Sequence, residues 1–320
     1  MSRQLPLAVY FEHQEWFRPL FAELDRRSIE YVRVDARCHM YDVTATDREY
    51  ALLFNRMSAS ACLRGNAQSI FFTRDYLAHL ERIGTRVING CKAFSLEISK
   101  ASQLALLHSL GLATPRSRIV NCPIQVASPA REIGFPIIIK PNIGGRGAGV
   151  MRFDSASALE DAVAAGEIHF GIDNTALVQE FLRVRGGHIT RVETLGGKFL
   201  YGIKIYTSGE SFNLCPAEIC MIEDGASAAN STGLVDAPKG GLKVERYTPP
   251  QQIIDAVERI VRAAQIEVGG VEYIVDDRDG RIVYYDINAL SNFVANAAQI
   301  LGFDPHVRLV DYLESEKDGA

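Results

Sequence analysis

The sequence predicts an α/β protein whose N-terminal part is a parallel sheet covered by helices and whose remainder forms α+β units. Three observations lead to this fold class. Short apolar runs alternate with helical patterns over the first ninety residues, as in a parallel sheet. A glycine-rich loop then separates two strands after residue 135, and a hairpin carrying acidic residues lies near the C-terminus.

Composition places the chain among ordinary globular proteins with about two or three core-bearing units. It has 320 residues, of which 47% are hydrophobic and 23% charged. The net charge of −5, with scattered Lys and Arg, argues against a nucleic-acid partner. The six cysteines form no C-x-x-C pair, the N-terminus lacks an apolar signal core, and no apolar run approaches the ~20 residues of a membrane span. We therefore expect a cytoplasmic protein with no membrane contact, and the composition is compatible with a homo-oligomer.

The first predicted domain covers residues 1–94 and is a βαβ unit. Its strands are expected at 5–11, 30–34, 50–55 and 86–88, and its helices at 15–27 and 60–82. Next, a helical period runs from 94 to 110, closes at Gly111 and carries Lys100. A strand at 117–120 and a linker marked by Pro123 and Pro129 follow.

The second predicted domain, 95–185, continues with a strand from 136, the glycine loop, a strand at 150–153, a helix at 155–165 and a strand at 176–182. The third, 186–320, opens with a hairpin of 191–194 and 198–206 around two glycines. Residues 207–242 show little periodicity, which is typical of a functional loop, and we expect them to cover the substrate. A helix at 250–265, a hairpin of 271–276 with 281–288, and helices near 293–300 and 305–313 complete the chain.

The glycine loop has the composition of a polyphosphate site. Lys140 ends a buried-type strand, and glycines follow at 144, 145, 147 and 149, so that backbone N–H groups could converge on anionic oxygens. The P-loop is excluded because no lysine follows the glycines, and the Rossmann fingerprint fails because Val150 stands where the third glycine should be. An ordinary hairpin loop stays an alternative from this segment alone.

A second candidate site is the hairpin from Gly270 to Asn288. A three-residue turn ending in Gly280 would place Glu272 opposite Asp286, with Asn288 on the same face. Two carboxylates and an amide oxygen on one sheet face match the ligands that Mg²⁺ prefers, and phosphate oxygens would complete its coordination shell. The alternative is a solvated hairpin in a register shifted by one residue, which would scatter the three side chains.

Other candidates carry less information. Gln179 and Glu180 end an apolar strand and could meet a base, although such strand ends more often face solvent. Arg56 and Ser58 follow an N-terminal strand, where ligands of parallel sheets gather, and could bind a substrate carboxylate; an exposed loop arginine is the equal alternative. The chain has no G-x-S-x-G hydrolase motif and no H-x-x-x-H zinc pair.

The order of these motifs resembles the ATP-grasp superfamily, above all the RimK-like glutamate ligases and enzymes of the glutathione synthetase type. The resemblance covers about residues 95–320, and the preceding βαβ region resembles the N-terminal substrate domain of these enzymes. It is carried by Lys100 on a helix before Gly111-Leu112-x-x-Pro115, Ile138-Ile139-Lys140-Pro141 with the glycine loop, Val178-Gln179-Glu180-Phe181, an arginine-bearing hairpin, and Glu272 with Asp286-x-Asn288.

The resemblance implies ATP bound between two α+β units and a ligase reaction in which an amine displaces phosphate from an acyl phosphate. The implied substrates are a small-molecule or peptide carboxylate and an amine, and the implied cofactors are ATP and Mg²⁺, with Mn²⁺ as a substitute. The implied roles are phosphate contact by Lys100 and Lys140 under Gly144, Gly145, Gly147 and Gly149, adenine contact by Gln179, Glu180, Phe181 and Leu182, catalysis by Arg191 and Lys204, and metal binding by Glu272, Asp286 and Asn288.

Three departures from the family pattern stand out. Asp286 replaces the usual glutamate, Ala289 to Asn292 replace a Pro-Gly step, and His188 stands near the usual ribose-binding acid. The metal geometry is therefore expected to be tighter, and the ribose contact is open. A non-catalytic ATP-binding module and a small-molecule kinase on the same fold are the alternative functions.

Overall fold

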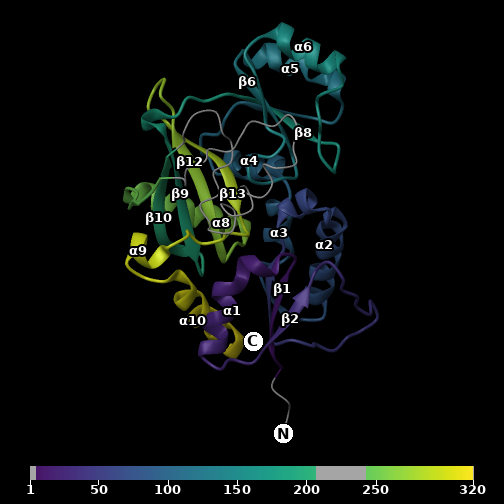
Figure 1. Cartoon of the computed structure of the whole chain (residues 1–320), viewed down its shortest axis with the longest axis vertical. Coiled ribbons are helices and arrows are strands. Elements are labelled where there is room, and N and C mark those ends of the chain that lie inside the picture. Colours follow the sequence, from purple (N-terminus) through teal and green to yellow (C-terminus); the bar gives the residue numbers. More distant parts are fainter. Residues whose placement is uncertain (1–4, 207–242, 320) are drawn as a thin grey trace.

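The computed structural model describes residues 5–206 and 243–319, and its strands form three sheets (Figure 1). The segment 207–242, which was predicted to cover the substrate and contains Cys215 and Cys220, lies outside the described residues. No helix in the described ranges is both long and apolar enough to span a membrane. The four cysteines within these ranges, Cys38, Cys62, Cys91 and Cys122, are free.

The N-terminal sheet is parallel throughout, as predicted, with the strand order β2-β1-β3-β4. Strand β1 therefore lies between its two successors in the sequence. The helices α1 and α2 connect the strands and cover the sheet. The elements are β1 Leu7–Phe11, η1 Gln14–Phe17, α1 Arg18–Arg26, β2 Tyr31–Asp35, β3 Leu52–Arg56, η2 Ala59–Arg64, α2 Ala67–Arg82 and β4 Arg86–Ile88.

The second sheet has the order β5-β8-β6-β7 and is antiparallel, and β6 and β7 flank the glycine loop as predicted. Helices α5 and α6 pack on it at one end of the molecule, far from the N-terminal sheet (Figure 1). The elements are β5 Ser117–Val120, η3 Pro123–Gln125, α5 Ala127–Ile133, β6 Ile137–Pro141, β7 Met151–Phe153, α6 Ala156–Ala164 and β8 Ala176–Glu180. The segment predicted as a linker thus contains a short helix, α5.

The third sheet, in the order β11-β10-β9-β12-β13, is also antiparallel. Helix α8 covers one of its faces, because its apolar residues recur at helical spacing and pack with β9, β12 and β13. The elements are η4 Arg185–Gly187, β9 His188–Leu195, β10 Lys198–Tyr206, β11 Val244–Arg246, α8 Gln251–Ala264, β12 Val268–Val275, β13 Ile282–Asn288, α9 Ala297–Leu301 and α10 Pro305–Asp318.

The helix predicted at 94–110 is two helices, α3 Cys91–Glu97 and α4 Lys100–Ser109. The break falls at Ser99, whose extended backbone and side chain cap α4 by accepting from the amide of Ser102. The prediction of one continuous helix was wrong because the apolar period continues across this cap. The break places Lys100 at the first position of α4 rather than in mid-helix.

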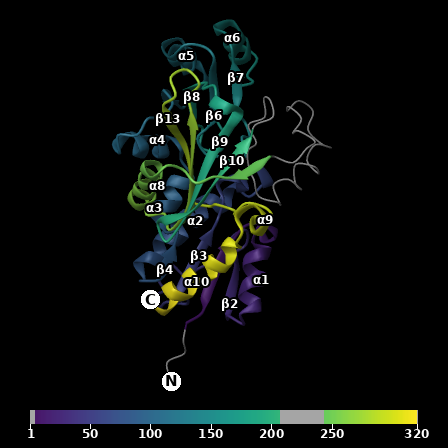
Figure 2. The same ribbon diagram turned by 90° about the vertical axis from the view of Figure 1, so that its left-hand side faces the viewer.

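Two hydrophobic cores cross the predicted domain limits. One contains residues of β1, β3 and α1 together with β10, β12 and α10, so the C-terminal helix packs beside α1 (Figure 2). The other joins α3 and α4 to α8 and the third sheet. The division at 94/95 and 185/186 stays a prediction, since burial ties these segments together.

Replacement of Ile260 in α8 by alanine should lower the free energy of unfolding by about 2–5 kcal/mol, because the side chain is fully buried in the core between α8 and the third sheet. Urea unfolding followed by circular dichroism would measure the change. Gln252→Ala, an exposed position of the same helix, should leave the midpoint nearly unchanged. Equal effects of the two substitutions would contradict this packing.

Candidate active site

A row of three charged side chains crosses the third sheet. Arg191 on β9 pairs with Glu272 on β12, and Glu272 pairs with Asp286 on β13. Directly paired residues point to the same face, so the three side chains lie side by side. Asn288 joins them, because its Nδ2 donates to Asp286 Oδ2 at 3.2 Å. The predicted opposition of Glu272 and Asp286, with Asn288 on their face, is confirmed.

The turn that produces this register differs from the prediction. Four residues rather than three close the hairpin, since Asp276 and Arg281 pair and Gly280 takes a left-handed φ of 80°. That change alone would shift the pairing by one residue. A β-bulge at Tyr285 restores it, because Tyr273 pairs with Tyr284 and the next pair skips Tyr285. The hydroxyl of Tyr285 donates to Glu272 Oε2 at 2.7 Å.

Arg191 is fixed by acceptors on all three of its nitrogens. Its Nε donates to Glu193 at 2.6 Å, its Nη1 to Glu272 at 3.2 Å, and its Nη2 to the hydroxyl of Ser291 at 2.8 Å. The arginine is 6% exposed. A buried guanidinium with three anchored nitrogens cannot swing away, so it holds Glu272 beside Asp286.

Lys100 and Lys140 reach the acid pair from different segments. Lys100 Nζ donates to Asp286 and forms an ion pair with it. Asn142, just after β6, links the two lysines: its carbonyl oxygens accept from the amides of Lys100 and Ala101 at 3.2 and 2.9 Å. The N-terminus of α4 is therefore tied to the end of the strand that carries Lys140. Lys100 contacts Asp286 directly, and the charges of Asp286 and Glu272 act on Lys140. The roles of both lysines toward phosphates stay predictions.

The pKa values of these groups reflect burial and their neighbours. Burial, and next Lys100, lower the pKa of Lys140 to about 7. Burial opposes the charge of Lys100, but Asp286 and Glu272 outweigh it and raise its pKa. Burial and the facing Asp286 raise the pKa of Glu272. For Asp286, burial is outweighed by Lys100, Lys140 and Arg191, so its pKa is lowered.

The donor set fits a hard divalent cation. The part of the chain that the structure describes holds no group of three His, Cys, Asp or Glu side chains that could bind a metal by itself. Glu272 and Asp286 with the amide oxygen of Asn288 make a partial oxygen shell, which suits Mg²⁺ because this ion keeps water and phosphate ligands. Metal binding would compete with Lys100 for Asp286.

The glycine loop lies against the N-terminal unit. Gly147 and Gly149 take left-handed φ values of 71° and 72°, and Arg146 between the glycines also has a positive φ of 59°. A Cβ on Gly145 would stand 3.1 Å from the Cβ of Ser60 in η2. A larger residue at 145 would therefore crowd η2, so glycine suits this close approach of the loop to the N-terminal unit.

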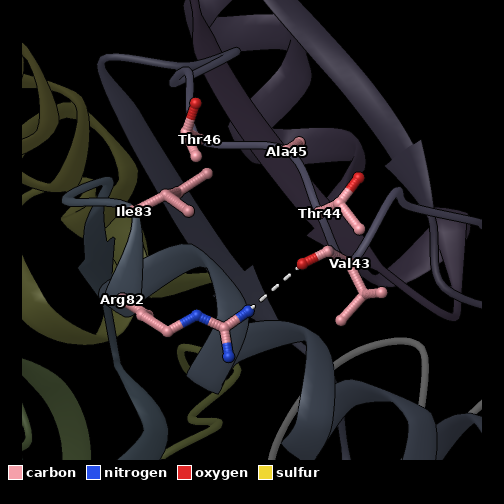
Figure 3. Close-up of a pocket in the computed structure, with 6 residues that line it drawn as sticks. All are labelled: Val43, Thr44, Ala45, Thr46, Arg82 and Ile83. Atoms are coloured by element: carbon pink, nitrogen blue, oxygen red, sulfur yellow. Dashed lines mark hydrogen bonds between the residues drawn. The ribbon is translucent and has the colours of Figure 1, made fainter.

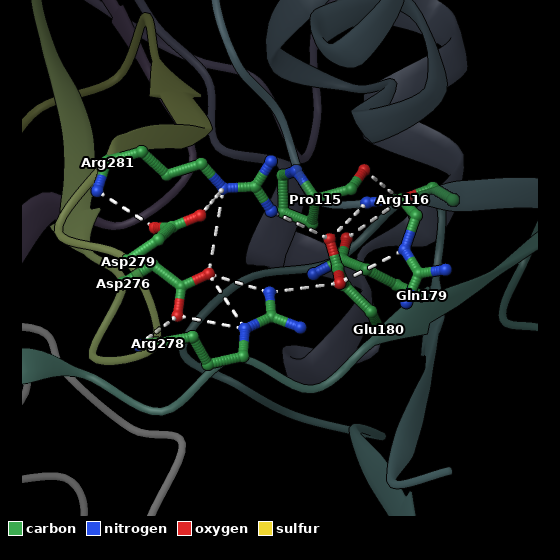
Figure 4. A network of polar contacts seen from close by, with 9 residues as sticks. Pro115, Arg116, Gln179, Glu180, Asp276, Arg278, Asp279 and Arg281 are labelled. Atoms are coloured by element: carbon green, nitrogen blue, oxygen red, sulfur yellow. Dashed lines mark hydrogen bonds and ion pairs between the residues drawn. The ribbon is translucent and has the colours of Figure 1, made fainter. Parts of the chain in front are cut away.

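Gln179 and Glu180 are buried, at 5% and 2% exposure, so the solvent-facing alternative is wrong. Figure 4 shows why: the carboxylate of Glu180 accepts from the backbone amide of Arg116 at 2.8 Å and from Arg278 at 3.2 Å. Asp276, fully buried, holds the same Arg278 at 2.6 Å. This network fastens the end of β8 to the turn of the β12–β13 hairpin, and it lowers the pKa of Glu180 although burial opposes that shift.

Lys204 and His188 lie outside the row. Lys204 pairs with Thr190, one position from the Ile203–Arg191 pair, so it points to the opposite face from Arg191 and lies 4.5 Å from the ring of Tyr247. Its catalytic role stays a prediction. His188, at the start of β9, donates from Nδ1 to the carbonyl oxygen of Gly186 in its own turn, at 3.1 Å.

Arg56 ends β3 and is buried, while the hydroxyl of Ser58 caps η2 by accepting from the amide of Ser60 at 3.1 Å. The alternative of an exposed loop arginine is therefore wrong. Sequence reasoning missed Glu97, whose carboxylate accepts from the amides of Ala289 and Leu290 at 2.7 and 3.1 Å. These amides belong to the stretch that replaces the family's Pro-Gly step, and that departure was the available signal.

A pocket of about 500 Å³ beside α2 is separate from this site. Thr44, Thr46, Arg82 and Ile83 line it, and Arg82 donates to the carbonyl of Val43 across it (Figure 3). None of the candidate residues takes part in this wall. The lining of this pocket includes one cationic side chain, Arg82, and no acidic one. The pocket therefore lacks the combination of acids and cations that the charged row has.

Comparison with known proteins gives no matching family model. A probable alpha-L-glutamate ligase of Teredinibacter turnerae is 28% identical over 226 residues, which are 66% of this chain and 74% of that protein. A D-alanine–D-alanine ligase of Pseudomonas fluorescens is 26% identical over 68% of this chain and 62% of its own length. The carbamoyl phosphate synthase large chain of a Thermotoga species is 28% identical, but the chain spans only 19% of its length.

Solved structures match almost the whole chain. The ATP-grasp ligase PsnB, complexed with its minimal precursor, superposes with a TM-score of 0.67 at 20% identity, covering 98% of this chain and 99% of PsnB. A RimK-domain ATP-grasp protein of Sphaerobacter thermophilus gives 0.64 at 17% identity over 96% and 99%. The chain therefore has the ATP-grasp fold. In sequence it is similar to ligases, among them a probable alpha-L-glutamate ligase and a D-alanine–D-alanine ligase.

Binding of ATP should draw a proton onto Lys140 at pH 8. With a pKa of about 7, Lys140 is mostly neutral at pH 8 in the free protein, and nearby phosphates would raise that pKa. At pH 6 the lysine is already charged, so it should take up no proton. Calorimetry in two buffers of different ionisation enthalpy counts the protons. Lys140→Met should remove the uptake, whereas the exposed Lys92→Met should not; uptake unchanged in Lys140→Met would contradict the assignment.

Proposed function

We propose that the chain is an ATP-dependent carboxylate–amine ligase, of the acid–amino acid ligase type, that forms an amide or peptide bond and releases ADP and phosphate. The single observation that carries the proposal is that Lys100 and Lys140 interact with the acids of the row of Arg191, Glu272 and Asp286, while the glycine loop follows the strand that carries Lys140. The matches to ligases for glutamate, D-alanine and a precursor peptide support it. The free cysteines support action in a reducing compartment such as the cytoplasm.

In this proposal ATP lies between the second and third sheets. Lys100 and Lys140 contact its phosphates, and the glycine loop closes over them. The adenine lies against the segment that joins the two sheets, where the side chain of Glu180 is engaged by arginines, so the backbone and neighbouring side chains make the contacts. The residues assigned to the nucleotide are Lys100, Lys140, Gly144, Gly145, Gly147, Gly149, Gln179, Glu180, Phe181 and Leu182.

The proposed reaction has two steps. A substrate carboxylate oxygen attacks the γ-phosphorus, the bond from that phosphorus to the β,γ-bridging oxygen breaks, and ADP leaves. An amine nitrogen then attacks the carbonyl carbon of the acyl phosphate, phosphate leaves, and the nitrogen loses a proton. Lys100 and Lys140 offset the negative charge of the phosphoryl oxygens, and Arg191 keeps the acid row in place. The closed loop excludes water, which would hydrolyse the acyl phosphate.

Glu272, Asp286 and Asn288 would hold Mg²⁺, for which Mn²⁺ is a substitute. When bound, the cation supplies positive charge that the phosphate oxygens share. Without the cation, the ion pair with Lys100 neutralises Asp286. Because the pair is largely withdrawn from water, Asp286 needs a positive partner, either Lys100 or the cation.

An isotope experiment tests the reaction. Amino acids and short peptides are screened for amine-dependent ADP release, and the active acid is then labelled with ¹⁸O in its carboxylate. The ligase transfers one ¹⁸O atom to the released phosphate, since the attacking oxygen leaves with phosphorus. ADP formed without any amine and without phosphate release would indicate a kinase, and AMP would contradict the proposal. Binding of ATP with no turnover on any acid and amine would favour the non-catalytic alternative.

Replacement of Asp286 by alanine should reduce turnover roughly 100-fold or more, because it removes a metal-binding carboxylate and leaves Lys100 unpaired. The rate should become less responsive to Mg²⁺ concentration. Asp279→Ala, in the exposed turn of the same hairpin, is the matched control and should keep the wild-type rate. Wild-type turnover in Asp286→Ala would remove this carboxylate from the proposed machinery.

A further inference from the structure

Arg56 lies where a parallel sheet offers its natural ligand site. In the order β2-β1-β3-β4 the chain leaves β1 toward one neighbour and later returns to its other side, so the strand order reverses between β1 and β3. Ligands bind in the crevice at the carboxyl ends of two such strands. Arg56 is the last residue of β3, and Glu12 directly follows β1.

The guanidinium of Arg56 is buried but only partly satisfied. The residue is 4% exposed, and its Nη2 donates to the carbonyl of Ser291 at 2.5 Å. Its Nη1 is buried without a hydrogen-bond partner among the described residues. The rings of Phe17 and Phe54 lie 5.2 and 5.0 Å from its central carbon. A guanidinium has five N–H donors, and leaving buried ones unpaired is costly.

The acids nearest to Arg56 are already engaged elsewhere. Glu97 accepts from the backbone amides of Ala289 and Leu290, and Glu193 accepts from Arg191 and from the hydroxyl of Ser291. Their charges attract Arg56, but they do not bond to it in the described structure. Glu12 is likewise held by Arg64, at 2.6 Å. Among the described residues, therefore, no carboxylate of the protein bonds to the unpaired Nη1 of Arg56.

A short chain of contacts connects Arg56 to the reaction site. Ser291 offers its carbonyl oxygen to Arg56 and its hydroxyl to Arg191, and Arg191 contacts Glu272. One residue thus separates Arg56 from the row that would hold the metal. A substrate group bound by Arg56 would lie next to the row, on the side of the N-terminal sheet. The same substrate molecule would then place its reacting group beside the row.

We propose that Arg56 binds a second, non-reacting carboxylate of the substrate, so that the ligase acts on an amino acid or peptide that carries a free carboxylate besides its reacting group. The proposal rests on the proposed ligase function. A carboxylate is the planar anion that a guanidinium binds through two parallel hydrogen bonds. A carboxylate held in this way is a weaker nucleophile, so the one bound to Arg56 is not the one that attacks ATP. Burial lowers the pKa of Arg56 to about 10, and the guanidinium stays charged at neutral pH.

A binding experiment tests the proposal separately from catalysis. Full-length protein with Mg²⁺ and a non-hydrolysable ATP analogue is titrated calorimetrically with the twenty amino acids and a set of dipeptides, each as the free acid and as its carboxyl amide. At least one free acid should bind, and its amide should bind ten-fold or more weakly. Arg56→Met should weaken binding of the free acid by ten-fold or more and leave the amide unaffected.

Arg74→Met, an exposed arginine of the same unit, is the control and should bind like the wild type. If Arg56→Met does not fold, Arg56→Lys tests the inference instead. Lysine keeps the charge but lacks the paired donors of a guanidinium, so binding of the free acid should weaken several-fold. Equal binding of acids and amides, binding of neither, or unchanged binding in the folded Arg56 variants would overturn the inference. Arg56-dependent binding without ADP release would refute the ligase function and keep this subsite.

Discussion

The like-charged pair of Glu272 and Asp286 is the constraint on which the rest of the site depends. Cross-strand pairing forces the two carboxylates together inside a buried face of the third sheet. Such an arrangement is unfavourable unless cations compensate it. Arg191 supplies one from the neighbouring strand, and Lys100 supplies another from α4. The negative charge of the acid pair would attract a metal ion, and the neighbouring Lys100 and Lys140 would attract phosphates.

The cations that compensate the acid pair are held in place by single polar side chains, which join distant segments. Asn142 fastens the start of α4 to the strand that carries Lys140, and Ser291 joins Arg191 to Arg56. Glu180 likewise joins β8 to the turn of the β12–β13 hairpin. These links cross from one sheet to another, so the relative placement of the sheets and the electrostatics of the site are set by the same contacts.

The sequence predicted the parallel N-terminal sheet, the strands around the glycine loop and the opposition of Glu272 and Asp286, because alternation and glycine turns are local signals. The register prediction held although the turn was wrong, since the bulge at Tyr285 compensated for the extra turn residue. The partners of Arg191 on other strands depend on tertiary contacts that no local pattern contains. The break at Ser99 is a local N-cap, which the continuous apolar period concealed. Lys204 was assigned together with Arg191 from motif order, whereas strand alternation places its side chain on the opposite face from Arg191.

The most direct test is a crystal structure with a non-hydrolysable ATP analogue and Mn²⁺, located by its anomalous scattering. We predict a manganese ion bound by Glu272, Asp286 and Asn288, with the β- and γ-phosphates in contact with Lys100 and Lys140. Lys100 should have exchanged Asp286 for phosphate. A nucleotide bound elsewhere, or manganese away from the hairpin with the Lys100–Asp286 ion pair intact, would contradict it.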